Sequence, residues 1–439
     1  MKELVRFLQL VVRSAQILSW SLAASIVFIF RLVVEILIVR STDGRAVLKA
    51  LGRALRFLLE GLGATFIKVG QIISTRPDLF PGEIVAELAM LQENVRPFAI
   101  ERVKEIIEED LGRPLDRIFA EFDSRPVAAA SVAQVHRARL RGSGDLVAVK
   151  VRRPSIARWA KLDQTIVLAV AHQLELIRSV RMLCPVDAAR QFCDAVNRQL
   201  DFRIEAANNR RFRHNFENFP EVVFPRLHDA LCSERVLTMD FVQGYREREF
   251  AQAGIDPKRV AGLGIKLFCQ MTLIDGFVHA DLHPGNVRYL PDHRVVLFDL
   301  GLTAELTEAD RVTFAQTMFY MANGMGQELA RHMYELCSHH AAVDYPAYEA
   351  EIKRWVERFT NRPLGEIEMT LAIGNFLDIF RRHRMQLDGR YTVLYISMMV
   401  VEGLGKKLDP DLDLIEAAKP YLAAALSSWQ ASQSAASAD

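Results

Sequence analysis

The residues best placed to do chemistry are two aspartates and an asparagine in the second half of the chain. Asp281 and Asn286 stand five residues apart in the segment HADLHPGN, residues 279–286. Asp299 follows the apolar, strand-type run Val295–Phe298 and is itself followed by Leu-Gly. Carboxylate and carboxamide oxygens are the ligands that magnesium prefers. The spacing therefore indicates a metal-dependent site built from two loops.

The same residues match two protein-kinase motifs. An Asp followed five residues later by an Asn is the pattern of the catalytic loop H-R-D-L-x-x-x-N, and an apolar strand ending in Asp-Leu-Gly resembles the D-F-G turn. In that pattern Asp281 orients or deprotonates the attacking hydroxyl, while Asn286 and Asp299 ligate Mg²⁺. Each motif alone is weak, but their order and spacing together predict a phosphoryl-transfer site.

Two histidines of the loop have an alternative interpretation as a zinc pair. His279 and His283 lie four residues apart, but Pro284 and Gly285 break a helix there, so the pair is not expected to bind zinc. We expect His283 to be an ordinary loop residue and His279 to brace the catalytic loop.

One lysine lies within an apolar strand-type run, Leu146–Val151. A buried lysine is costly unless it is paired, so we expect the Lys150 ammonium to meet phosphate and carboxylate. This is the V-A-I-K element, whose lysine grips the α- and β-phosphates. The best candidate for the paired carboxylate is Glu205, in the helix-type segment 200–208.

The usual glycine-rich phosphate loops are missing. No G-x-G-x-x-G precedes Lys150 and no G-x-x-x-x-G-K-[ST] occurs in the chain. At the expected place stand Ala128, Ala129, Ala130 and Ser131, whose Cβ atoms restrict positive φ. We expect phosphate contacts through Ser131 and nearby N–H groups. No A-P-E follows Asp299, so a peptide-substrate platform is not evident.

The elements that must position these residues divide the chain of 439 residues into five regions. Strand-type runs occur at Leu146–Val151, Val236–Val242 and Val295–Phe298, and residues 256–439 are otherwise mostly helical by periodicity. The predicted regions are an apolar and basic leader (1–60), a helical extension (61–122), a sheet-bearing lobe (123–242), a helical lobe (243–426) and a frayed tail (427–439).

The charge composition indicates which kinds of partner the protein can bind. The formal net charge is +1, so no global field favours nucleic acid, but the first sixty residues hold nine Lys/Arg against four acids, a local +5. Such a basic end on apolar sequence suits an anionic membrane surface. The five cysteines form no CxxC pair, so a reducing compartment fits best.

The leader contains a possible membrane segment, residues 14–38. Ser14–Phe30 is an uncharged run of 17 residues, at the lower limit for crossing a bilayer. No A-x-A-like cleavage site follows closely, which argues against a secretory signal. Two readings stay open: a membrane-embedded helix, and an amphipathic or buried one. If the helix spans, the basic flank after Arg31 keeps the rest of the chain cytoplasmic.

Over residues 60–410 the chain resembles the UbiB family of atypical kinase-like proteins, also called the ADCK family. The diagnostic element is the K-x-G-Q motif formed by Lys68, Val69, Gly70 and Gln71. Taken alone, Lys68 and Gln71 would as readily be an exposed polar stripe on one helix face. The further matches are residues 74–79, the Ala-rich loop 128–131, Gln134–His136, Val147–Lys150, the segment around Glu205, Val236–Asp240, and Glu402–Gly403.

The resemblance implies an α+β, protein-kinase-like two-lobed fold. This fold has a small antiparallel-sheet N-lobe and a helical C-lobe, and extra N-terminal helices carrying K-x-G-Q would be added to them. Those helices would fold over the active site and occlude the place where a protein substrate binds. Lys150 and Glu205 would form the strand–helix ion pair, and Asp201 would belong to an E-x-D motif. Its first position is Gln199 here, which weakens charge or metal coupling at that point.

The resemblance also implies the ligands and setting. ATP or ADP with Mg²⁺ would bind at residues 128–131, Lys150, Asp240 and Val242, with Asp281 in the catalytic-base position. The partners expected are the nucleotide, a membrane lipid or quinone precursor, and quinone-biosynthesis proteins, but not nucleic acid. We expect a membrane-associated protein whose catalytic part is cytoplasmic, as at a bacterial inner membrane.

Three functions are compatible with the sequence. The first is an ATPase or small-molecule or lipid kinase supporting ubiquinone or other isoprenoid-quinone biosynthesis. The second is an aminoglycoside- or choline-kinase-like phosphotransferase, which uses a similar loop but lacks K-x-G-Q. The third is a non-catalytic, nucleotide-switched scaffold for a lipid-biosynthesis complex. Filled catalytic positions favour the first.

Overall fold

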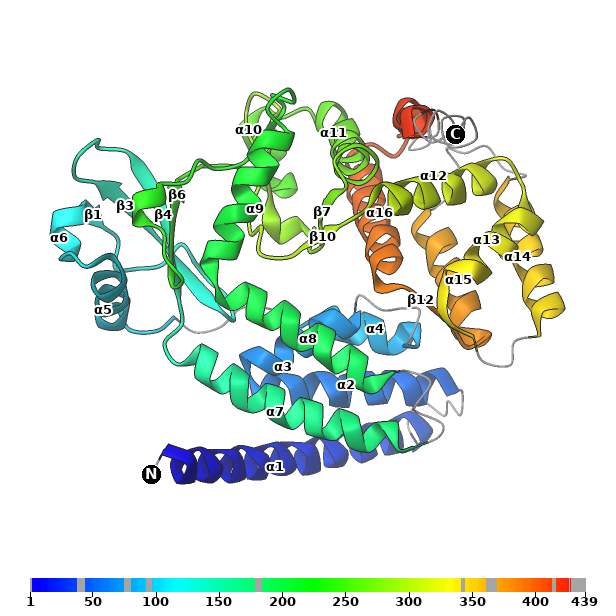
Figure 1. Ribbon diagram of the computed structural model, residues 1–439, viewed down its shortest axis with the longest axis horizontal. Helices are drawn as coiled ribbons and strands as arrows, with labels where there is room; N and C mark the ends of the chain where they lie inside the picture. Colours follow the sequence, from blue (N-terminus) through cyan, green and yellow to red (C-terminus); the bar gives the residue numbers. More distant parts are fainter. Residues whose placement is uncertain are drawn as a thin grey trace, which may run out of the picture. The chain divides into compact units, whose positions relative to one another are not determined.

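The chain, analysed as a computed structural model, forms two compact units (Figure 1). The first comprises residues 1–206 and 226–241, and the second comprises residues 207–225 and 242–439. The structure describes residues 2–37, 44–74, 80–91, 97–177, 184–340, 344–360, 369–412, 416–425 and 427. Residues 75–79 of the motif region and the predicted tail beyond residue 427 lie outside these ranges.

Helices dominate both units. In the first unit they are α1 (Lys2–Leu37), α2 (Gly44–Leu62), α3 (Ala64–Ser74), α4 (Gly82–Leu88), α5 (Ile100–Leu111), α6 (Leu115–Ile118), α7 (Ile156–Glu175), α8 (Pro185–Leu200) and the start of α9 (Phe202–Asn215). In the second unit they are the rest of α9, α10 (Phe250–Ala253), α11 (Pro257–Cys269), α12 (Glu308–Ala322), α13 (Gly326–Leu336), α14 (Tyr345–Thr360), α15 (Met369–Arg382) and α16 (Gly389–Leu408).

The strands are short. The first unit holds β1 (Phe119–Phe122), β2 (Ala128–Ala129), β3 (Ala133–Leu140), β4 (Leu146–Arg152) and β6 (Val236–Asp240). The second unit holds β5 (Val222–Val223), β7 (Phe277–His279), β8 (Val287–Tyr289), β9 (Val295–Leu297), β10 (Thr303–Glu305), β11 (Cys337–His340) and β12 (Met385–Leu387).

The first unit is built on one antiparallel sheet. Its order is β1-β3-β4-β6, with β2 added to β3, and β4 is a central strand. Alternate side chains of β4 point to opposite faces. Val147, Val149 and Val151 pack with α5 on one face, while Ala148 on the other face contacts the cluster that contains Phe202 of α9. This alternation turns Lys150 toward α9.

The remaining helices of the first unit form a layer of their own. Helix α2 contacts α1, α3 and α4, and α7 packs along α8. Apolar residues of α2, α3 and α4 form one cluster, among them Leu59, Ile67 and Leu88. Val69 of α3 contacts a second cluster formed by α7 and α8. The helix carrying Lys68 and Gln71 is thereby fixed to α8.

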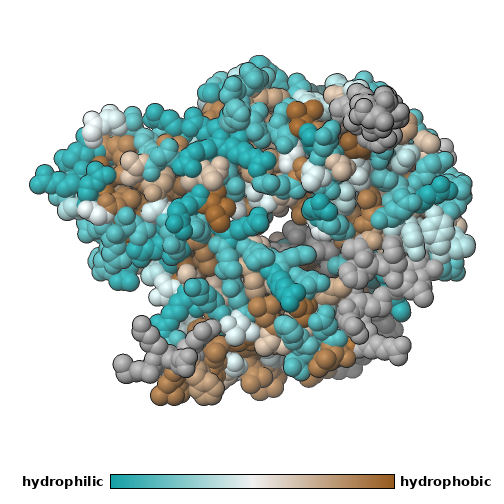
Figure 2. Space-filling view, in the orientation of Figure 1, coloured by the Kyte–Doolittle hydropathy of each residue, from teal (hydrophilic) through white to brown (hydrophobic). Residues whose placement is uncertain are grey.

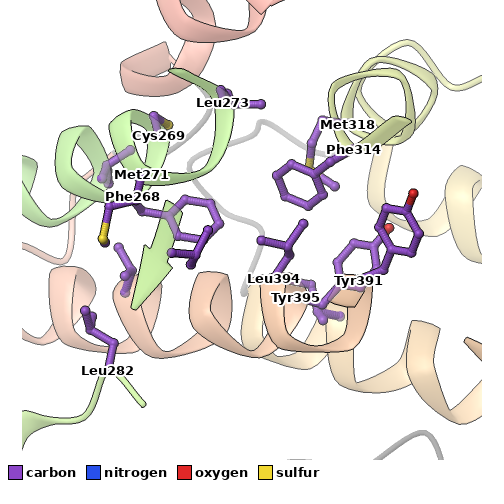
Figure 3. Packing of buried hydrophobic residues seen from close by; sticks show 14 of the residues in the cluster. Phe268, Cys269, Met271, Leu273, Leu282, Phe314, Met318, Tyr391, Leu394 and Tyr395 are labelled. Atoms are coloured by element: carbon purple, nitrogen blue, oxygen red, sulfur yellow. The ribbon is translucent and has the colours of Figure 1, made fainter. Parts of the chain in front are cut away.

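The second unit is held together by one large apolar cluster. Helices α11 and α16 pack against each other, as do α12 with α13, α13 with α14, and α15 with α16. Figure 3 shows part of the cluster, where Phe268 of α11, Phe314 of α12 and Tyr395 of α16 approach one another. The three-stranded sheet β5-β9-β8 and the pair β10-β7 carry the loops that follow β7 and β9.

Three details of the sequence prediction were wrong. Residues 119–122 lie in strand β1, although 61–122 were expected to be helical. The predicted strand run 236–242 ends at Asp240. Beyond residue 256 the structure has β7, β8, β10, β11 and β12 in addition to the predicted strand. Strands of three or four residues show no measurable period, and their pairing partners define them.

Candidate phosphoryl-transfer site

In the first unit, Lys150 and Glu205 form an ion pair. The Lys150 Nζ lies 3.0 Å from Oε1 and 2.8 Å from Oε2 of Glu205. The two side chains are only 14% and 7% exposed, and the Lys150 ammonium also lies 5.3 Å from the ring centroid of Phe202. The pairing predicted from the sequence is present because β4 turns Lys150 toward the first turn of α9.

The Ala-rich segment 128–131 makes a tight turn between β2 and β3. Ala128 and Ala129 pair with Val135 and Gln134, and the Ala130 N–H donates to the Ala133 carbonyl over 2.8 Å. Ser131 is 1% exposed, and its hydroxyl has no hydrogen-bond partner among the residues that the structure describes.

Asp201 lies between α8 and α9 and forms an ion pair with Arg203. Its Oδ2 accepts from the Arg203 guanidinium over 2.7 Å, and its Oδ1 accepts from the Arg203 backbone N–H over 3.0 Å. The side-chain hydrogen bond from Arg203 holds the pKa of Asp201 below its ordinary value. The carboxylate is thus ionised and already engaged within the first unit.

Helix α3 carries both residues of the K-x-G-Q motif. The Gln71 amide nitrogen donates to the Leu91 carbonyl over 3.3 Å, while its Oε1 is buried and has no partner within the described part of the chain. A Cβ at Gly70 would approach the side-chain ends of Leu91 to 2.1 Å and of Leu59 to 2.7 Å, so both leucines would have to shift. Lys68 is partly buried on the same helix.

The end of β6 is where the chain passes from the first unit to the second. Asp240 accepts from His228 Nε2 over 2.9 Å and from Arg226 over 3.3 Å, so its side chain is held inside the first unit. Val242 is the first residue of the following segment of the second unit. Asp240 and Val242, both predicted to contact the nucleotide, therefore stand on either side of the boundary between the units in the chain.

In the second unit, hydrogen bonds join the catalytic loop to the Asp299 turn. The Asn286 side-chain amide donates to the Asp281 carbonyl over 3.0 Å, which closes the five-residue loop. The Asn286 carbonyl accepts from the Phe298 N–H over 2.9 Å, directly before Asp299. Asn286 is 7% exposed, and its amide nitrogen is used internally. Its Oδ1 is the atom left to face a ligand.

His279 braces this arrangement, as its place in the sequence predicted. The ring is completely buried, and its Nδ1 accepts from the Asp281 N–H over 3.1 Å. Its Nε2 faces the Phe298 carbonyl at 3.3 Å, so the neutral tautomer protonated on Nε2 satisfies both contacts. Burial lowers the pKa of His279, which keeps the ring neutral.

Asp299 itself has a left-handed backbone, with φ of 51°. A residue with a Cβ in this region costs on the order of 1–3 kcal/mol and persists only where the surroundings impose it. Asn208 of α9 supplies part of that constraint, because its side-chain amide donates to the Leu300 carbonyl over 2.7 Å. Asn208 lies three residues after Glu205, and no sequence motif marks it as a site residue.

The side chains at the predicted positions carry the donor atoms that Mg²⁺ and nucleotide phosphates require. The Asn286 Oδ1 and the Asp299 carboxylate are hard oxygen donors of the kind that Mg²⁺ takes. In the first unit, the unpartnered hydroxyl of Ser131 and the buried ammonium of Lys150 suit phosphate oxygens.

The N-terminal helix α1 is long and apolar enough to cross a membrane, by length and composition. The stretch Phe7–Val33 is 6% buried, and its exposed apolar side chains gather along the helix in Figure 2. The opposite face contacts α2 and α7. There Arg13 Nε lies 2.6 Å from Asp163 Oδ1, and the Arg13 guanidinium donates to the Leu62 carbonyl over 2.8 Å.

Comparisons with known proteins define the class. Residues 90–333 match the ABC1 atypical kinase-like domain, and residues 352–413 match the UbiB helical domain. A structure from Mycobacterium tuberculosis, titled the complex of Rv3197 with erythromycin, aligns with a TM-score of 0.54 at 22% identity, covering 79% of this chain and 90% of that chain. The fold is that of an α+β, kinase-like protein, as predicted.

Curated relatives identify the family. Proteins named probable protein kinase UbiB from Vibrio cholerae and Aliivibrio fischeri are 35% and 34% identical over 393 residues, covering 88% of this chain and 72% of theirs. The one from Cronobacter sakazakii is 33% identical over 381 residues, covering 85% and 70%. The chain therefore belongs to the UbiB family of atypical kinase-like proteins, which confirms the resemblance found in the sequence.

Proposed function

We propose that this protein is an ATP-binding enzyme of phosphoryl transfer, an ATPase or a small-molecule or lipid kinase, that supports ubiquinone or related isoprenoid-quinone biosynthesis at a membrane. The observation that carries the proposal is the hydrogen-bonded catalytic loop. Its three bonds, from Asn286 to Asp281, from Phe298 to Asn286 and from Asp281 to His279, support the reactive geometry before any ligand binds. Membership of the UbiB family supports the assignment to quinone metabolism.

The nucleotide phosphates would be held by residues of the first unit. Lys150 would grip the α- and β-phosphates while Glu205 fixes the direction of its ammonium. The turn formed by residues 128–131 would offer N–H groups and the Ser131 hydroxyl to phosphate oxygens. Backbone groups of the segment around Asp240 and Val242 would contact the adenine base.

Asp281 would act as the catalytic base. Its backbone N–H is fixed by His279 and its carbonyl by Asn286, so its carboxylate is held at a defined place on the loop. Asn286 and Asp299 would hold Mg²⁺, which when bound supplies charge neutralisation on the transferring phosphoryl group. Neutral His279 adds no competing positive charge to the loop.

Helix α3 would close the site to protein substrates. Lys68 and Gln71 lie on a helix fixed to α8, and α8 ends at Leu200 next to Asp201. A small or membrane-borne acceptor fits such a closed site better than a polypeptide. Quinone precursors, which are phenols with isoprenoid chains, are acceptors of that kind.

We infer that α1 lies along the membrane with its exposed apolar face in lipid. If α1 left the first unit to cross the bilayer, the buried Asp163 would lose its Arg13 partner, at a cost of about 3–5 kcal/mol. An in-plane helix keeps this ion pair and still buries the apolar face. The local +5 of the first sixty residues favours anionic headgroups, and quinone-biosynthesis proteins would meet the enzyme there.

The test is genetic complementation of a bacterial host that lacks its own UbiB-family protein and makes little quinone. We expect the wild-type chain to restore quinone content, and Asp281→Asn and Asp299→Asn to fail at equal expression. Full rescue by both variants would support a non-catalytic scaffold and contradict the proposed function.

A further inference from the structure

One arginine of the first unit contacts the Ala-rich turn, residues 128–131, and the residue after it. Arg153 comes directly after β4, and its backbone N–H donates to the Val132 carbonyl over 2.8 Å. Its side-chain Nε donates to the Ala130 carbonyl over 2.9 Å. The carbonyls on both sides of Ser131 are therefore directed toward Arg153, a residue that lies outside the V-A-I-K element.

The bond to Ala130 fixes the direction of the next N–H group. A trans peptide is planar, and its carbonyl oxygen and its amide hydrogen point to opposite sides. Because the Ala130 carbonyl points toward Arg153, the Ser131 N–H points away from Arg153. Within the described chain this N–H has no backbone acceptor, and the buried Ser131 hydroxyl has no hydrogen-bond partner. Two donors of one residue are thus left for a ligand.

This pair of donors suits an anion with several acceptor oxygens. Backbone N–H groups in turns and hydroxyl groups both donate to phosphate. If the peptide between Ala130 and Ser131 reversed its direction, the Ala130 carbonyl oxygen would take the place of the N–H. That oxygen carries partial negative charge and would repel a phosphate. The hydrogen bond from Arg153 opposes this reversal.

Arg153 is held in place by Phe98, the second residue before α5. The guanidinium carbon of Arg153 lies 5.6 Å from the centroid of the Phe98 ring, within the range of a cation–π interaction. The backbone of Phe98 is bound by the Gln134 side chain of β3. The Phe98 N–H donates to Gln134 Oε1 over 3.0 Å, and the Phe98 carbonyl accepts from Gln134 Nε2 over 3.3 Å.

Gln134 is fixed in turn by His136, and both side chains are buried. Gln134 Nε2 also donates to His136 Nε2 over 2.9 Å, and His136 Nδ1 donates to the Asp123 carbonyl over 2.8 Å. The neutral tautomer protonated on Nδ1 satisfies both contacts of the ring. A buried network in which every group is satisfied is rigid. Phe98 therefore has a defined place against Arg153.

We propose that Arg153 is a positioning residue of the nucleotide site, whose Nε fixes the peptide between Ala130 and Ser131 so that the Ser131 N–H faces the nucleotide phosphates. Phe98 keeps the guanidinium in place for this bond. The role requires a hydrogen-bond donor at the Nε position and does not require the positive charge. It rests on the proposed function, because it needs a nucleotide at the Ala-rich turn.

Two substitutions of Arg153 separate the donor from the charge. Arg153→Gln places an amide nitrogen at the position of Nε, whereas Arg153→Met has a similar length and no donor. ADP affinity, measured calorimetrically with Mg²⁺, should fall about tenfold or more in Arg153→Met, the size of one hydrogen bond to a charged group. Arg153→Gln should stay within about threefold of the wild type, since a neutral donor forms a weaker bond. Phe98→Leu should lower ADP affinity about two- to fivefold.

Arg139→Met is the matched control. Arg139 of β3 also donates to a backbone carbonyl, that of Gly144, over 2.9 Å, but away from the Ala-rich turn. Its ADP affinity should equal that of the wild type. Adenosine, which lacks the phosphates, should bind Arg153→Met and the wild type equally. An equal loss of adenosine and ADP affinity in Arg153→Met would indicate general damage to the fold and would overturn the positioning role.

The remaining outcomes distinguish this role from the proposed function. Equal ADP affinity in Arg153→Met and the wild type would overturn the positioning role and leave the nucleotide site in place. A loss in Arg153→Gln as large as in Arg153→Met would also overturn it, because the charge and not the donor would then be required. Absence of ADP binding by the wild type itself would contradict the proposed function, and the positioning role with it.

Discussion

The ammonium of Lys150 lies 2.8 and 3.0 Å from the two carboxylate oxygens of Glu205, 55 residues away in the chain. Both side chains are largely buried, so the ion pair offsets part of the cost of removing each charge from water. The pair therefore links the stability of the first unit to the group that we assign to the nucleotide phosphates.

Removing one member of this pair should be costly for folding. We expect Lys150→Met to lower the free energy of unfolding by about 3–5 kcal/mol, because the buried Glu205 carboxylate loses the Lys150 ammonium. The double variant Lys150→Met/Glu205→Leu should recover most of that loss, since an apolar pair of similar volume can replace a buried ion pair. Urea denaturation measures both. ADP binding should be lost in the single and the double variant alike; retained binding in the double variant would contradict a phosphate contact by Lys150.

Substitution of Ser131 tests whether its hydroxyl binds the nucleotide or stabilises the fold. Its buried hydroxyl has no partner among the described residues, so Ser131→Ala should leave stability unchanged or raise it by about 1 kcal/mol. ADP affinity should fall about tenfold, because a hydrogen bond to a charged phosphate is lost. Thr238→Val on β6 is the matched control, since the Thr238 hydroxyl is also buried and unpartnered. Equal ADP affinity in Ser131→Ala and wild type would remove Ser131 from the nucleotide site.

The burial of His279 should make the folding stability depend on pH. Burial lowers the pKa of His279, so as pH falls below about 6.5 the unfolded chain gains a proton at this ring that the folded chain does not. Folding stability is therefore lost as pH falls from about 6.5 toward the folded pKa, by up to about 1.4 kcal/mol per pH unit. His279→Gln should be less stable at neutral pH but show a shallower slope in this range. His214→Gln, at a mostly exposed ring, should keep the wild-type slope; an unchanged slope in His279→Gln would mean that the ring is charged in the fold.

The orientation of α1 can be determined from the position of its N-terminus. An in-plane helix keeps an N-terminal tag on the same side of a vesicle as the catalytic part, whereas a spanning helix places it on the opposite side. We expect protease added to inverted membrane vesicles to remove an N-terminal tag and a C-terminal tag together. Protection of the N-terminal tag alone would show that α1 crosses the bilayer. Arg13→Leu, which breaks the ion pair with Asp163, should loosen α1 and increase hydrogen exchange in α1 without detaching the protein from the vesicles.

Some elements could be predicted because they are coded locally. The run Leu146–Val151 marks β4 since a central strand is apolar on both faces, and the lysine within it required a carboxylate partner that only tertiary packing could supply. The spacing of Asp281, Asn286 and Asp299 is likewise a local signal. Strand β1 could not be predicted, because residues 119–122 are only four and show no apolar–polar alternation.

Other features depend on contacts between distant segments. The left-handed backbone of Asp299 and the bond from Asn208 to Leu300 arise only when α9 meets the turn after β9. The grip of Arg203 on Asp201 has no counterpart in the motif, which names Asp201 alone. The bond from Arg153 to the Ala130 carbonyl leaves no sequence pattern either, since it forms only when β4 pairs with β3.

The most direct test of the account is ATP turnover by the purified protein with anionic lipid and a phenolic quinone precursor, measured against Mg²⁺ concentration. We predict that the wild type turns over ATP, and that Asp299→Asn loses about 10²-fold or more of the rate, because a charge that stabilises the transition state is removed. Asp299→Asn should still bind ADP through Lys150. Turnover by Asp299→Asn equal to that of the wild type at every Mg²⁺ concentration would contradict the central claim.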